Sequence, residues 1–132
     1  MGETIVIADD EPDLRAIYSE ILRFDGHDVR EAADGIEALA LVASSRPALL
    51  LLDVWMPGLS GFEVLDRLRV DPSASSLKVV MHSNLDDADA LLEGYSHGVV
   101  DYLVKGLSIE EFRERIRQAI AAVSVASGDW DG

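Results

Sequence analysis

The chain has 132 residues, of which 25 are acidic and 11 basic, so its formal net charge is −14, and it contains no cysteine. This length predicts one domain with a core of its own. The absence of cysteine excludes disulfides and thiol chemistry. The negative charge argues against direct binding of nucleic acid, whose phosphates it would repel. Because neither a signal-peptide pattern nor an apolar stretch of about eighteen residues occurs, we expect a cytoplasmic protein with no membrane contact.

Short apolar runs alternate with longer segments of helical period along the whole chain. Strands are predicted over residues 4–8, 28–32, 48–52, 77–82 and 99–104. Helices are predicted to begin near Pro12, Asp34, Ser60, Asp86 and Ser108. Asp34 to Glu37 and Ser60 to Glu63 are capping-box patterns.

The first and last helices have apolar faces that predict burial against a sheet. These faces comprise Leu14, Ile17, Tyr18, Ile21 and Leu22 in the first helix, and Ile109, Phe112, Ile116, Ala119, Ile120 and Val123 in the last. Five strand-then-helix units predict a doubly wound α/β fold, with one parallel sheet between two helical layers. We expect this domain to cover residues 1–126 and to be followed by a flexible tail over 127–132.

Acidic residues stand where two apolar runs stop. Asp9 and Asp10 follow the first run, and Asp53 follows a run of four leucines. Because ligand sites of open α/β sheets lie at the carboxyl ends of the strands, we expect the three carboxylates to converge there. Lys105, after the fifth run, would point into the same crevice. Hard oxygen ligands of this kind suit Mg²⁺.

These residues, taken in order, resemble the receiver domain of bacterial two-component response regulators from about Thr4 to Val123. The matching pieces are the Asp9–Asp10 pair, Asp53 with its following loop, Ser83 after the fourth strand, and residues 101–105. The resemblance implies a flavodoxin-like sheet with strand order 2-1-3-4-5, the order of the chemotaxis regulator.

The resemblance also implies what these residues do. Asp53 accepts a phosphoryl group from a histidine kinase or a phosphotransfer protein, so the chain is a phosphoacceptor rather than an enzyme with turnover. Mg²⁺ is held by Asp9, Asp10, Asp53 and the main-chain carbonyl of Trp55. Lys105 pairs with a phosphoryl oxygen.

A switch pair follows from the same resemblance. The hydroxyl of Ser83 donates to the phosphoryl group, and Tyr102 moves from an exposed to a buried rotamer. The surface over residues 86–97, 99–104 and the last helix then changes and signals to a partner protein. Three departures from the family stand out: Gly106 replaces the usual proline after Lys105, Asn84 follows Ser83 where a small Ala or Gly is common, and apolar Trp55 and Leu85 occupy positions that tune loss of the phosphoryl group.

Other interpretations remain open from the residues alone. Asp9 and Asp10 could cap the first helix. A phosphohydrolase that forms an aspartyl phosphate is an alternative, although the dehalogenase-like pattern needs an aspartate where Trp55 stands. A flavodoxin-like binding module would need a phosphate loop after the first strand, where this chain has acids. We expect a single-domain regulator rather than a piece cut from a longer one.

Overall fold

The computed structural model describes residues 2–84 and 88–122. One parallel sheet has the strand order β2-β1-β3-β4-β5. Its strands are β1 Thr4–Ala8, β2 Asp28–Ala32, β3 Leu49–Asp53, β4 Lys78–Ser83 and β5 Asp101–Val104. Its helices are α1 Pro12–Phe24, α2 Gly35–Ser45, α3 Gly61–Val70, α4 Ala88–Ser96 and α5 Ile109–Ala121. The predicted fold class and strand order are confirmed.

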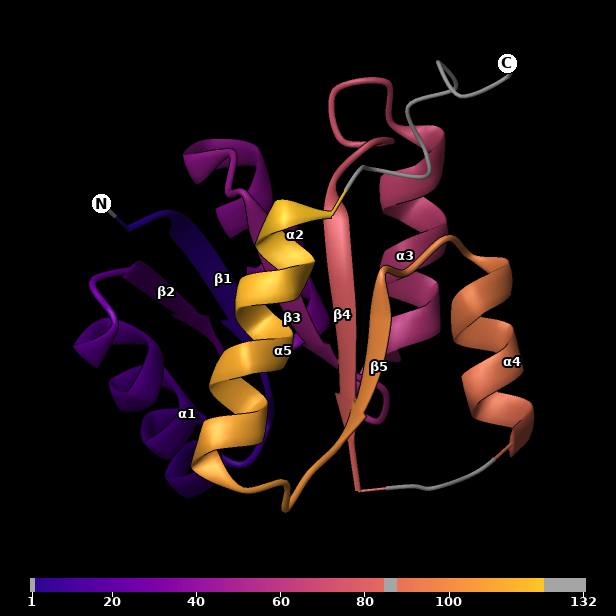
Figure 1. The fold of residues 1–132 in the computed structure, drawn as a ribbon. Coiled ribbons are helices and arrows are strands. Elements are labelled where there is room, and N and C mark those ends of the chain that lie inside the picture. The colour runs from indigo at the N-terminus through magenta and orange to yellow at the C-terminus, as the bar shows by residue number, and fades with distance from the viewer. Residues whose placement is uncertain (1, 85–87, 123–132) are drawn as a thin grey trace.

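Three layers follow from burial of the sheet on both faces (Figure 1). β3 is buried at all five positions, as expected of a central parallel strand. Helices α1 and α5 cover one face, where Tyr18, Leu22, Phe112 and Ile116 pack against alternate strand residues. Helices α2 and α3 cover the other face together with α4, and the core there is separate from the first.

Local signals place most helix starts correctly. Ser60 and Glu63 form a complete capping box, in which each side chain accepts a hydrogen bond from the other residue's backbone N–H. Asp34 also caps α2 by accepting from the N–H of Glu37. The carboxylate of Glu37, however, accepts from the N–H of Ala33 instead of that of Asp34, so the second box is shifted by one residue.

Two predicted core residues are wrong. Ile17 is 54% exposed and Ile109 is 55% exposed. Tyr18 and Leu22 occupy the side of α1 that meets the sheet, which leaves Ile17 turned outward. Ile109 is the first residue of α5 and borders an open hollow beside Phe24. The prediction for Val123 and for the tail over 127–132 lies outside the described residues.

Candidate functional site

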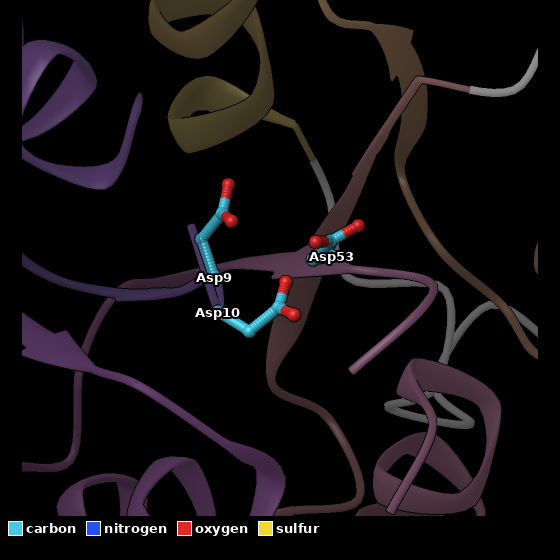
Figure 2. Close-up of side chains that lie close together, drawn as sticks. All are labelled: Asp9, Asp10 and Asp53. Atoms are coloured by element: carbon cyan, nitrogen blue, oxygen red, sulfur yellow. The ribbon is translucent and has the colours of Figure 1, made fainter. Parts of the chain in front are cut away.

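Three carboxylates meet at the carboxyl edge of the sheet (Figure 2). Because β1 and β3 are hydrogen-bonded neighbours, Asp9 and Asp10 after β1 come beside Asp53 at the end of β3. One carboxylate oxygen from each lies within 4.8 Å of the others. Asp9 and Asp53 are buried, whereas Asp10 is half-buried. The structure therefore brings together the three acids that the sequence predicted as ligands.

Backbone contacts fix the two buried acids. The Oδ1 atom of Asp9 accepts a hydrogen bond from the N–H of Glu11 at 2.9 Å, and Oδ1 of Asp53 accepts from the N–H of Trp55 at 3.4 Å. The N-cap of α1 is Glu11, without a side-chain cap bond. The alternative in which Asp9 and Asp10 serve as the helix cap is thus wrong.

Glycine is required where α3 begins. A Cβ atom on Gly61 would lie 2.4 Å from the carbonyl oxygen of Asp53, far inside van der Waals contact. The N–H of Gly61 also donates to the carbonyl of Val54 at 2.8 Å. This close approach packs the start of α3 directly against the loop that follows Asp53.

Lys105 lies among the acids, as predicted. Its Nζ atom is 2.8 Å from Oδ2 of Asp9, 3.3 Å from Oδ2 of Asp53 and 3.2 Å from Oε1 of Glu11. Burial by itself would lower the pKa of Lys105, but hydrogen bonds and attraction from these carboxylates raise it above its ordinary value. Lys105 is therefore a fixed positive charge in the site.

Glu11 is a member of the site that sequence reasoning missed. Its position directly after the acid pair was the available signal. It is largely exposed and reaches Lys105 from the solvent side.

Asp53, the candidate nucleophile, lies in surroundings that disfavour its ionised form. Burial, followed by repulsion from Asp9, raises the pKa of Asp53 to about 6, against the opposing effects of Lys105 and the Trp55 N–H. Asp10, by contrast, makes no ion pair with any residue in the described part of the chain.

Ser83 and Tyr102 flank the site on β4 and β5. Ser83 ends β4, is 1% exposed, and its carbonyl accepts a 2.7 Å hydrogen bond from the N–H of Lys105. Tyr102 is 4% exposed and belongs to the core cluster with Met81 and Val99, close to Gly94 of α4. In this structure Tyr102 thus has the buried position that the resemblance associates with the switched state.

The loop after β5 adopts a conformation that only glycine accepts freely. Gly106 has φ +102°, and no cis peptide bond occurs in the described residues. The ion pairs of Lys105 hold its side chain in place without the usual proline. Trp55 is 57% exposed. Leu85 lies outside the described residues.

A buried histidine beneath the site was also missed. His82 is the register partner of Asp53, is 2% exposed, and packs edge-on to Tyr18 at 4.5 Å and beside Phe112. Burial, assisted by the charge of Lys105, lowers the pKa of His82 to about 3, so the ring is neutral. Its position on a predicted strand was visible, but the aromatic neighbours from two helices were not.

Comparison with known proteins agrees with this geometry. The sequence model of the response regulator receiver domain matches residues 5–117. The chain is 36% identical over 113 residues to the DNA-binding dual master transcriptional regulator RpaA of Synechocystis, covering 86% of this chain and 47% of that protein. It is 30% identical over 118 residues to sporulation initiation phosphotransferase F of Bacillus subtilis, covering 89% and 94%.

Solved structures of response regulators are also similar to this chain. The chemotaxis response regulator CheY4 of Vibrio cholerae superimposes with a TM-score of 0.84 at 27% identity, covering 90% of this chain and 99% of that one. The chain belongs to the response regulator receiver domain family of two-component systems. It spans about half the length of RpaA and several other curated relatives. None of the helices in residues 2–84 and 88–122 combines the length and apolar character needed to cross a bilayer.

Proposed function

We propose that this chain is cytoplasmic, that Asp53 accepts a phosphoryl group from a phosphohistidine of a histidine kinase or phosphotransfer protein, and that residues 1–126 form the receiver that carries it. The single observation that carries this proposal is the meeting of Asp9, Asp10, Asp53 and Lys105 at one strand edge. Three acids around one fixed lysine form an acceptor site for a phosphoryl group only if a further cation joins them.

The donor set fits Mg²⁺. Carboxylate oxygens within 4.8 Å of one another are hard ligands, and Mg²⁺ in proteins takes one or two carboxylates and keeps several waters. Asp10 and Asp53 would hold the ion with the main-chain carbonyl of Trp55, and Asp9 would contribute directly or through water. When bound, Mg²⁺ supplies positive charge that offsets the charge of the phosphoryl oxygens.

Asp53 and Lys105 would have different roles in phosphoryl transfer. A carboxylate oxygen of Asp53 attacks phosphorus, a P–O bond forms, and the P–N bond of the donor breaks with its electrons leaving on the imidazole. Lys105, already 3.3 Å from Asp53, would pair with a phosphoryl oxygen. Because Lys105 is held by Asp9 and Glu11, it is positioned before the donor arrives.

The response to phosphorylation would run through Ser83 and Tyr102. A phosphoryl group adds about −1.5 to −2 charges and three acceptor oxygens, to which the Ser83 hydroxyl can donate. This attraction would draw the end of β4 inward and favour the buried Tyr102 beside α4. The surface of α4, β5 and α5 would then present a changed face to a partner protein. With a net charge of −14, these residues themselves are not proposed to bind DNA.

Phosphoryl acceptance is tested by comparing the wild type with Asp53→Asn. Acetyl phosphate with Mg²⁺ should add one phosphoryl group to the wild type, detected by intact-protein mass, and none to the variant. Glu93→Gln, which removes an exposed carboxylate of α4, is the matched control and should label normally. Equal labelling of Asp53→Asn and the wild type would rule out Asp53 as the acceptor.

A phosphohydrolase would behave differently in the same assay. It would release phosphate many times per chain, whereas the proposed receiver reacts about once before slow hydrolysis. A flavin-binding module would be yellow and would not label.

A further inference from the structure

His97, outside the acidic site, links the C-terminal end of α4 to α3. It directly follows α4, and its ring lies beside that of Phe62 in α3, with 6.0 Å between the ring centroids. The Nε2 atom is 2.7 Å from Oδ1 of Asp66, also in α3. The Nδ1 atom is 2.8 Å from the main-chain carbonyl oxygen of Glu93 in α4. The side chain of His97 is 23% exposed, so most of its surface is covered.

These two contacts together require a proton on each ring nitrogen. A carbonyl oxygen and an ionised carboxylate only accept hydrogen bonds, and a neutral imidazole has one N–H and one lone pair. In either neutral tautomer, one nitrogen lone pair of His97 would face an oxygen lone pair at hydrogen-bond distance. The hydroxyl of Ser96 does not supply the missing proton, because it is 3.5 Å from Nδ1 and donates to the Glu93 carbonyl at 2.7 Å. The geometry is therefore that of an imidazolium ion.

The charged groups that meet His97 come from both helices. They are Asp66 and Arg69 of α3 and Glu93 of α4, and the guanidinium of Arg69 donates to the main-chain carbonyl of His97 at 2.9 Å. The hydrogen bond to the Glu93 carbonyl, followed by the hydrogen bond to and the charge of Asp66, raises the pKa of His97 above 6.5 against the effect of burial. The ring should therefore exchange its second proton within the neutral to mildly alkaline range.

Two ties hold the end of α4, and only one of them depends on pH. Arg69 donates to the carbonyls of His97 and Gly98, and arginine stays protonated across the neutral range. The second tie is the His97 ring. The last turn of α4 contains no basic residue, so protonated His97 supplies a positive charge next to the partially negative end of this helix.

We propose that His97, Asp66 and the Glu93 carbonyl form a pH-sensitive latch that joins the C-terminal end of α4 to α3 only while His97 is protonated. A neutral ring can keep one of its two contacts and must release the other. It then loses either its cap on α4 or its link to α3. The side chain of Asp66 is 65% exposed, so its carboxylate can turn to water when released.

The direction of the pH dependence follows from the raised pKa. The latch contributes stability that is fully present below pH 6.5 and is lost as the pH rises through the pKa of His97 in the folded chain. The end of α4 should therefore be held more firmly in acid than in alkali. The latch needs no phosphoryl group, so it stands or falls independently of the role proposed for Asp53.

The protonation of His97 is tested by NMR of the imidazole nitrogens in EDTA. Both nitrogens should be protonated at low pH, and one should lose its proton with a midpoint above 6.5. Asp66→Asn keeps an acceptor oxygen and removes the charge, so it should lower this midpoint. Glu93→Gln keeps the main-chain carbonyl and should lower it less.

The hold on α4 is tested by hydrogen exchange, with protection factors compared at pH 6 and pH 8.5. The reporters are the N–H groups of His97, Gly98 and Val99, which donate to carbonyls of α4. Their protection should fall about two- to fivefold between the two pH values in the wild type. It should stay nearly constant in His97→Gln, whose amide does not titrate.

Two control variants separate His97 from other groups that titrate. His27→Gln removes a histidine beside β2, at the other edge of the sheet, and should keep the wild-type change. Asp53→Asn removes the carboxyl whose pKa is raised to about 6 and should also keep it. A midpoint of His97 at or below 6.5, a midpoint unchanged in Asp66→Asn, or an equal loss of protection in His97→Gln would each overturn the proposal.

Discussion

Replacing Asp53 with asparagine should stabilise the metal-free domain. Burial raises the pKa of Asp53 from 3.8 to about 6. A difference of about two units corresponds to roughly 3 kcal/mol of unfavourable interaction of the ionised form. Solvent near half-buried Asp10 screens part of this, so we expect a gain of about 1–3 kcal/mol in the free energy of unfolding. Asparagine keeps the acceptor for the Trp55 N–H and removes the charge.

The stability gain of Asp53→Asn should depend on pH. Above pH 6 Asp53 is ionised in both folded and unfolded chains, so the full cost is present. As the pH falls through about 6, the folded chain takes up a proton while the unfolded chain stays ionised until about 3.8. The cost therefore disappears over that window. The advantage of Asp53→Asn should be largest above pH 6 and close to zero near pH 4.

The assay is urea unfolding in EDTA at several pH values across this window. The matched control Glu93→Gln removes an exposed carboxylate and should shift stability little at any pH. Added Mg²⁺ should stabilise the wild type and not Asp53→Asn. A variant less stable than the wild type at pH 8, or a difference independent of pH, would refute the claim that burial of this charge is unfavourable.

Three further results are expected. Asp10→Ala should lose Mg²⁺-dependent quenching of Trp55 fluorescence; unchanged quenching would show that Asp10 is not a ligand. Trp55→Asn should shorten the lifetime of the phosphorylated protein after donor removal, since an amide can orient a water that an indole excludes; equal decay would contradict shielding. Burial lowers the pKa of His82 from 6.5 to about 3, so on this histidine only the unfolded chain takes up a proton below pH 6.5; by itself this should lower stability by about 2 kcal/mol from pH 7 to 5, opposite in sign to the effect of Asp53. The stability difference between the wild type and His82→Leu should change by that amount over this range, and a constant difference would assign the pH dependence to other groups.

The sequence by itself determined the fold class and the position of the acids. Alternation of strand and helix predicts one parallel sheet, and an apolar run buried on both faces must end at the sheet edge. Asp9, Asp10 and Asp53 follow such runs, so their meeting depends only on which strands are neighbours. The capping pattern of Ser60 and Glu63 is equally local, since its partners are three residues apart.

Only the tertiary structure decided which contacts form between distant residues. Glu11 reaches Lys105 across 94 positions of sequence, and His82 is enclosed by side chains from α1 and α5. Ile17 and Ile109 have a core-like spacing yet remain exposed, because Tyr18 and Leu22 take the side of α1 that meets the sheet and Ile109 is the first residue of α5. Local patterns depend on neighbours in the chain, whereas these contacts depend on how whole elements pack.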